Sequence, residues 1–192
     1  MFKGQYVFSQ ITDHLPLHTF RRCVERYLGE RYVKHCKCYD QYLAMSFAQL
    51  THRESLRDIE ACLQAQSSKL YHIGFRSSIS RSTLADVNEQ RDWRIYADFA
   101  QALIRIARPL YGGDQLELDL KNTVSSLDPS TIDLCISVFP WELFRTTKSA
   151  AKLHTLLDLS GIIPSFVHIS QGKLHNINTI DIIIPEASSF YV

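Results

Sequence analysis

The spacing of apolar residues changes along this chain at residues 111–114, where two glycines separate a helical pattern from an alternating one. Before this point apolar residues recur every three or four positions, which is typical of helices packed on a core. After it, leucines alternate with polar residues over 116–120, which is typical of strands. The sequence therefore predicts a helical domain over residues 1–110 and a second, strand-containing domain over residues 114–192.

The first domain divides into segments with recognisable ends. We expect helices over residues 16–27, 40–49, 53–66, 81–88 and 93–108. Gly29 is placed to end the first helix. Thr51 and Glu54 have the spacing of a capping box for the third. Ser80 is expected to open the fourth helix, and Pro109 to end the fifth.

In the second domain, the sequence predicts several strands and one helix. The strands are expected over residues 122–127, 131–139, 152–159 and 164–170, with a further one beginning at 190–192 and a helix over 176–184. The last of these strands has no evident room to pair. Asp128 would then lie at a strand end, where a rigidly held carboxylate suits a hard divalent cation. The following Pro129-Ser130 suits an ordinary turn equally well.

The charge is unevenly distributed, although the formal total is only +1. Residues 1–110 hold 16 Lys and Arg against 11 Asp and Glu, whereas residues 111–192 hold 5 against 9. One interpretation is a domain that faces a polyanion followed by one that gathers carboxylates, and the other is chance scatter. A hydrophobic content of 45% excludes a disordered tail.

Neither a membrane span nor an export signal is evident. No apolar stretch is long enough to cross a bilayer, and the first residues lack the apolar segment of a signal peptide. These features predict a cytoplasmic protein without a membrane partner. The five cysteines are an odd number in a chain of this kind, which predicts reduced structural thiols. Cys36 and Cys38 do not have a zinc-knuckle spacing.

Several short stretches share their order and spacing with one known family. They are Tyr6–Gln10, Gln49–Asp58, Tyr71–Phe75, Ser82–Arg91, Ser130–Phe139, Lys152–Asp158 and Pro164–Ile169. Together they resemble the DDE transposases of bacterial insertion sequences, in the branch with a Tyr-Arg-Glu-Lys signature. The resemblance covers essentially the whole chain, but only the N-terminal portion of such a transposase.

The resemblance implies a fold and a chemistry. The implied fold class is α followed by α/β, with a helical DNA-binding domain joined to an incomplete RNase H-like domain. The implied activity is DNA strand cleavage and joining with Mg²⁺ or Mn²⁺ held by two Asp and one Glu. Asp128 matches the first Asp, which makes it the candidate catalytic and metal-binding residue, while Pro129 replaces the family's usual serine. The other two acids belong beyond Phe190–Val192, so we expect a truncated transposase that is inactive alone.

The expected partner is double-stranded DNA at transposon ends. The helices over 53–66 and 81–88 are expected to pair in the manner of a helix-turn-helix. The candidate DNA-binding residues of this part are Arg76, Arg81, Ser82, Thr83 and Arg91. Lys152 and His154 are two apart on one expected strand and therefore share a face. They are candidates for phosphate contact, or else an edge pair satisfied by water.

Two other functions stay open. The chain is alternatively a stand-alone DNA-binding module or regulator derived from a transposase, which would occupy transposon ends and inhibit the full enzyme. A weaker third hypothesis is an RNase H-like nuclease whose carboxylates converge on Asp128 from other positions.

A homodimer is compatible with each of these hypotheses, and the expected location is the bacterial cytoplasm, in association with the nucleoid. Tyr42, Tyr71 and Trp93 are expected to be core or partial-core aromatics rather than base-stacking groups.

Overall fold

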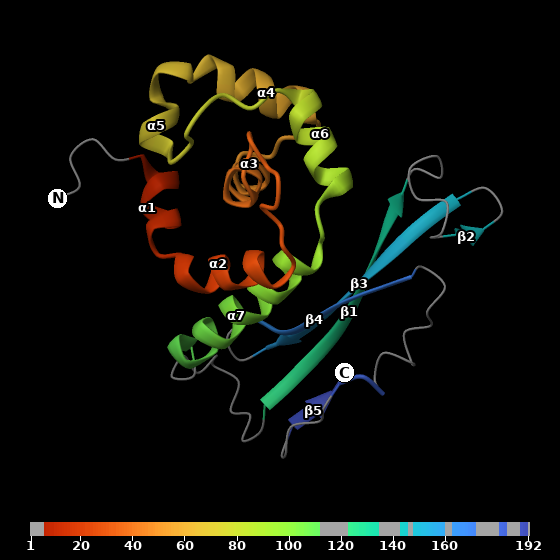
Figure 1. The fold of residues 1–192 in the computed structure, drawn as a ribbon. Coiled ribbons are helices and arrows are strands. Elements are labelled where there is room, and N and C mark those ends of the chain that lie inside the picture. The colour runs from red at the N-terminus through yellow and green to blue at the C-terminus, as the bar shows by residue number, and fades with distance from the viewer. Residues whose placement is uncertain are drawn as a thin grey trace. The chain divides into compact units, whose positions relative to one another are not determined.

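The computed structural model describes residues 6–111, 123–134, 143–145, 148–159, 163–171, 181–183 and 189–191. The chain divides into two compact units, Met1–Phe99 and Ala100–Val192. The division falls inside helix α7 (Arg94–Tyr111), before the glycines at which the sequence pattern changes. Within the described residues the fold is mixed α/β, with helices in the first unit and a sheet in the second (Figure 1).

The first unit is helical throughout its described part. Its elements are α1 (Val7–Asp13), α2 (Leu17–Arg26), α3 (Cys38–Leu50), α4 (Leu56–Ala65), the 3-10 turn η1 (Ser67–Lys69), α5 (Leu70–Ile73), α6 (Arg81–Gln90) and the start of α7. The expected helices correspond to α2, α3, α4, α6 and α7, so this part of the prediction is confirmed. The short helices α1 and α5 were not predicted, because neither is long enough to show a helical period.

Helix α3 forms the centre of this unit. Figure 1 shows it nearly end-on, with α1, α2, α4, α5 and α6 around it. One apolar cluster joins Phe47 of α3 to Leu63 and Phe75. A second, aromatic cluster forms around Phe20, whose ring centroid lies 5.0 Å from that of Phe99. Both clusters are closely packed, so α3 is the element against which the others are ordered.

A single amide in α3 links several of these elements. Gln41 is only 6% exposed. Its Nε2 donates to Oδ1 of Asn88 at 2.6 Å and to the carbonyl of Val87 at 3.4 Å. Its Oε1 accepts from the Tyr96 hydroxyl at 2.6 Å and from the Arg91 guanidinium at 3.2 Å. Two donor and two acceptor sites are the full capacity of a glutamine amide, so the buried polar group is satisfied.

The sequence suggested that Gly29 ends helix α2, but the left-handed residue that follows the helix is not this glycine. The left-handed residue is Leu28, with φ of 52°. Its N–H donates to the carbonyl of Glu25, and the Gly29 N–H donates to the carbonyl of Val24 at 2.9 Å, which is the Schellman pattern. The next position, Gly29, is crowded, so a larger residue there would require neighbouring side chains to move. A Cβ at position 29 would lie 2.5 Å from Cδ1 of Ile95.

The capping box predicted at Thr51 and Glu54 is wrong. The Thr51 hydroxyl donates back to the carbonyl of Phe47 at 2.7 Å, at the end of α3. Ser55 caps α4 instead, because its hydroxyl oxygen accepts from the Asp58 N–H at 3.2 Å. Ser55 and Asp58 repeat, four residues later, the spacing of a hydroxyl residue and an acid, so two adjacent capping signals compete at this point.

Two other helix predictions had different outcomes. Ser80 caps α6 as expected, and its Oγ accepts from the Thr83 N–H at 3.2 Å. Pro109 lies inside α7 rather than after it. A proline there is tolerated because α7 ends two residues later, at Tyr111, so the missing N–H affects only the final turn.

Two aromatic predictions are also corrected. Tyr42 is half-buried, with its ring centroid 5.5 Å from that of Phe99, as expected for a core aromatic. Tyr71 and Trp93 were expected to lie wholly or partly in the core but are 84% and 55% exposed. Tyr71 belongs to the four-residue helix α5, which buries Leu70 and leaves the next side chain in solvent.

The second unit contains a mixed sheet. Its described strands are β1 (Thr123–Leu134), β2 (Leu143–Arg145), β3 (Lys148–Asp158), β4 (Ile163–Gln171) and β5 (Ser189–Tyr191). Strand β3 is central, because β1 pairs with it on one side and β4 and β2 pair with successive stretches of it on the other, all antiparallel. Strand β5 is parallel to β1. The expected strands over 152–159 and 164–170 are confirmed as β3 and β4.

Three strand predictions are corrected. The two strands expected on either side of Asp128 and Pro129 are one strand, β1, which passes through both residues without a turn. Proline is tolerated there because, among the described residues, no strand pairs with the other edge of β1 beyond Ser125. The last strand does pair, through β5 with β1. A helix was also expected over residues 176–184. Of these, residues 181–183 form a turn and a bend instead, and the others lie outside the described residues.

The Gln41 network leads to a stability prediction. Gln41→Leu keeps the size of the side chain but leaves the Tyr96 hydroxyl, Arg91 and Asn88 without their shared partner. We expect the free energy of unfolding to fall by about 2 kcal/mol or more. Gln49→Leu, at an exposed position of the same helix, is the matched control and should change it by about 0.5 kcal/mol at most. Urea denaturation of both variants measures the difference, and equal losses would contradict the role given to Gln41.

Candidate functional site

The first turn of α6 presents hydroxyl groups and a cation. Ser80 Oγ lies 2.8 Å from Thr83 Oγ1 and 3.1 Å from Ser82 Oγ. Arg81 and Ser82 are exposed, and Thr83 is half-buried. The first N–H groups of a helix have no partners within the helix, so this end attracts anions. Three of the predicted DNA-binding residues therefore lie together at one helix end.

Arg76 lies in the segment that leads into α6. Phe75 and Ile79 are buried at either end of a short exposed stretch, with 1% and 6% of their surfaces accessible. The segment is therefore attached to the core at both ends, and Arg76 is exposed between them. This placement leaves the guanidinium accessible to solvent, while the predicted contact of Arg76 with DNA stays a prediction.

Arg91 has a structural position. It is half-buried, and its guanidinium donates to the Cys36 carbonyl at 2.8 Å and to Gln41 Oε1 at 3.2 Å. Burial raises the pKa of the neighbouring Cys38 thiol to about 11, although Arg91 opposes the shift. That thiol is protonated at neutral pH and is not a reactive group. Among the described residues, the cysteines have free thiols; they are Cys23, Cys36, Cys38 and Cys62. Cys135 lies outside the described residues.

The two helices expected to pair do lie together. Helices α4 and α6 are in contact, and residues 66–80 between them contain η1 and α5. A helix-turn-helix has a tight turn at this point. The connection here contains two further helical elements, so the pair shares with that motif only the contact between its helices.

Asp128 lies within β1 rather than at its end. It is exposed, stands opposite Thr155 of β3, and accepts a hydrogen bond from Ser130 Oγ at 3.4 Å. In the part of the chain that the structure describes, no three His, Cys, Asp or Glu side chains gather in a way that would hold a metal ion. Asp128 and its described neighbours therefore do not fit a complete divalent-cation site.

Strand β5 lies beside the start of the strand that carries Asp128 (Figure 1). Its register pairs Thr123 with Ser189 and Ser125 with Tyr191. Parallel strands keep a one-to-one register, and Asp128 is three residues after Ser125. The described part of β5 therefore lies alongside the residues before Asp128 and does not reach it.

Lys152 and His154 share one face of β3, which is the central strand and not an edge. Across the strands Lys152 pairs with Ser170, and His154 pairs with Pro129 and His168. The His154 side chain is fully buried, and its Nε2 lies 2.8 Å from Ser170 Oγ. Its ring centroid is 6.2 Å from that of His168. The structure thus gives His154 a partner within the sheet, while its predicted contact with phosphate stays a prediction.

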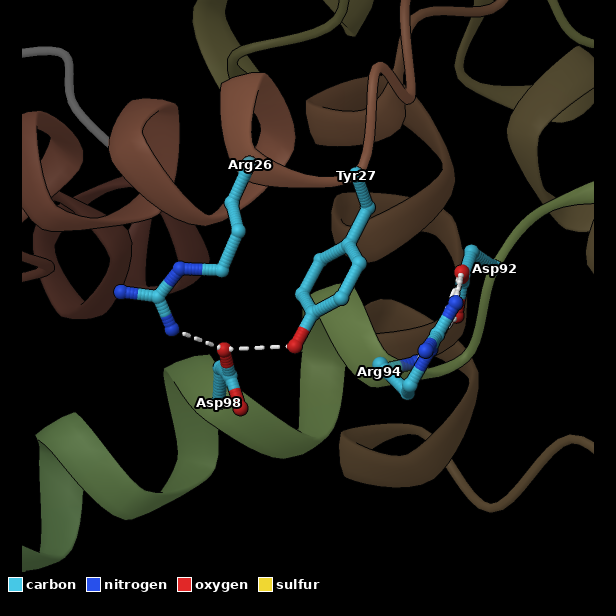
Figure 2. Close-up of polar contacts among 5 residues, drawn as sticks. All are labelled: Arg26, Tyr27, Asp92, Arg94 and Asp98. Carbon is cyan, nitrogen blue, oxygen red and sulfur yellow. Dashed lines mark hydrogen bonds and ion pairs between the residues drawn. The ribbon is translucent and has the colours of Figure 1, made fainter.

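Figure 2 shows how the end of α2 is fixed to α7. Asp98 accepts from the Arg26 guanidinium and, at 3.0 Å, from the Tyr27 hydroxyl. Arg94 lies over the Tyr27 ring, 4.8 Å from its centroid, and forms an ion pair with Asp92. These contacts hold the residues that come directly before the left-handed turn at Leu28.

Sequence reasoning missed a group of cations near this turn. Arg21, Arg31 and Lys37 line one pocket together with Arg76, which was predicted on other grounds. A local excess of charge was available as a signal, because residues 21–37 contain six Lys and Arg against two Glu. The charge was counted over residues 1–110 as a whole, and this local excess is not visible in that total.

The buried imidazole predicts a pH dependence. Burial lowers the pKa of His154 below its ordinary value of 6.5, and the nearby His168 and Lys152 lower it further. The unfolded chain therefore binds a proton first as the pH falls, so stability is lost as the pH drops through about 6.5. We expect the melting temperature to fall between pH 8 and pH 5, and to fall less in His154→Gln, which does not titrate.

The matched control for this measurement is His18→Gln. His18 is exposed on α2, so its replacement makes the same chemical change outside the sheet and controls for the substitution itself. An identical pH dependence in the wild type and in His154→Gln would show that His154 does not titrate with folding.

Comparison with known proteins bears on the helical unit. Residues 3–76 match the family described as a domain of unknown function (DUF4372), and this domain is found in transposase-like proteins. No curated protein and no solved structure matches the chain significantly. Among the described residues, none of the helices combines the length and the apolar composition that crossing a membrane requires.

Proposed function

We propose that this chain works in DNA transposition and binds double-stranded DNA at transposon ends through its helical unit. The observation that carries the proposal is the match of residues 3–76 to a domain of transposase-like proteins. The chain's resemblance to insertion-sequence transposases extends beyond that match. The exposed cations and hydroxyls before and within the first turn of α6 supply the surface that such binding needs.

The proposed contact combines a helix end with side chains. Free N–H groups at the start of α6 receive a phosphate, with Ser82 and Thr83 as additional hydroxyl donors. Arg76 and Arg81 neutralise the same DNA strand from exposed positions. Arg91 acts differently, as a positioning residue that ties the end of α6 to Gln41 and Cys36.

For the second unit we propose the N-terminal part of an RNase H-like domain, with Asp128 as its first acid. The arrangement of the sheet supports this, because β5 runs parallel to and directly beside the strand that carries Asp128. In the resembled family the second Asp belongs to the strand that begins at β5. Mg²⁺ or Mn²⁺ is the implied cofactor, but the described residues do not complete its site, so the proposal for this chain is limited to DNA binding.

The duplex-binding proposal predicts the effect of a charge reversal. Arg81→Glu should weaken binding to a duplex of the element's terminal repeat by about tenfold, which corresponds to the loss of one charge-assisted contact. The slope of log Kobs against log salt should fall by about 1. Fluorescence anisotropy over a salt series measures both quantities.

Arg22→Glu makes the same charge change at an exposed position of α2 and is the control for general electrostatics. If Arg81→Glu and Arg22→Glu weaken duplex binding equally, the helix end is not the contact.

A plasmid-nicking assay separates DNA binding from catalysis. Because only one of the three implied acids is matched by a residue of this chain, we expect it to leave supercoiled plasmid uncut in Mg²⁺ while still binding duplex DNA. Nicking that Asp128→Ala abolishes would contradict this and would favour the nuclease reading. Tight binding without nicking fits both a transposase part and a regulator that occupies transposon ends.

A further inference from the structure

A pocket of about 540 Å³ opens beside α2 within the helical unit. Its apolar lining comes from one face of α2 and from the segments after it: Leu17, Phe20, Val24, Leu28 and Tyr39. Its cations come from three separate parts of the chain, and they are Arg21, Arg31, Lys37 and Arg76. The pocket is therefore an apolar surface assembled by the fold and bordered by these four cations and by three carboxylates, with a formal excess of one positive charge.

The carboxylates of the pocket offset only part of this charge. Glu30 is paired with Lys37 at 3.6 Å. Asp40 is buried and accepts the Lys37 backbone N–H at 2.9 Å, at the start of α3. Glu25 is the third acid. Among the described residues, none of the three lining arginines is in an ion pair, so guanidinium groups remain available to an anion.

One residue of the pocket wall has a backbone conformation that is unfavourable for a side chain other than glycine. It is Leu28, which is left-handed and 63% exposed. Tyr32, which follows the lining residue Arg31 but does not line the pocket itself, is left-handed as well, with φ of 62°, and 87% exposed. The Arg31 guanidinium stands 5.0 Å from the centroid of the Tyr32 ring. Non-glycine residues held in this backbone region are found preferentially at ligand-binding sites, and here they present apolar surface to solvent.

We propose that this pocket binds an unpaired nucleotide of a DNA strand, with the base on the apolar lining and the neighbouring phosphates on the arginines. A duplex offers phosphates but hides the faces of its bases, so it would leave the apolar lining unused. A single strand offers both, and the combination of a cationic groove with a surface for bases is how such strands are bound. The volume is in the range of small-ligand pockets. The inference rests on the proposed function in that the ligand is DNA.

The test compares two single-stranded oligonucleotides of equal length and charge, one of which carries abasic sites at its central positions. The whole 192-residue chain is titrated with each, and fluorescence anisotropy gives the affinities. We expect the abasic strand to bind about fivefold more weakly or worse, since one base contact contributes at least that much. Equal affinities would overturn the inference.

Three variants locate the effect. Arg21→Glu should weaken binding of both strands, whereas Arg22→Glu, the next residue of α2 and not part of the lining, should weaken it much less. Leu28→Asn removes the apolar wall and keeps a residue that tolerates the left-handed backbone. We expect its melting temperature to stay the same or rise while the preference for the intact strand is lost. Retention of that preference would contradict a base on Leu28.

Two further probes distinguish this inference from the proposed function. The terminal-repeat duplex reports on the helix end of α6: if duplex binding is absent and the intact single strand is still preferred over the abasic one, the proposed function fails and the pocket assignment stands. The reverse result overturns the pocket and leaves the proposed function. An acidic peptide of the same charge is the last probe, and tighter binding of this peptide than of the oligonucleotide would assign the pocket to a protein partner and overturn the inference.

Discussion

The buried amide of Gln41 is the interaction on which the helical unit depends. A polar group at the centre of a core is tolerated only when all its hydrogen bonds are formed, and Gln41 forms them with the end of α6, the residues after it and the start of α7. Burial raises the pKa of Tyr96, so its hydroxyl stays protonated and remains a donor in this network. The position of α6 is thus determined by the geometry of one side chain in α3.

This dependence connects the core to the candidate site. Arg91, which sequence reasoning placed among the DNA contacts, joins the same network and fixes the C-terminal end of α6. The opposite end of that helix presents Arg81 and the hydroxyl groups. A rigid helix held at one end by the core is a suitable support for a phosphate contact at the other, because the N–H groups are then fixed in position before a ligand arrives.

The sequence predicted those features that depend on local chemistry. Ser80 was found because a serine followed by a helical pattern is a local signal, and β3 and β4 were found from local segments rich in apolar residues. Thr51 and Ser55 show the limit of such signals, because both have capping chemistry and only packing decides between them. Pro129 and His154 required tertiary information. A proline in a strand is acceptable only when the strand has an unpaired edge, and the burial of an imidazole depends on neighbouring strands.

The left-handed leucine at the end of α2 has a consequence for comparisons among related chains. Glycine or asparagine would serve the Schellman turn better than Leu28 does, so stability alone would not retain leucine there. Gly29, by contrast, is favoured by its close approach to the side chain of Ile95. In an alignment of relatives, we would therefore expect glycine at position 29 wherever this packing is kept, and a large apolar residue at position 28 where the proposed pocket ligand is also bound.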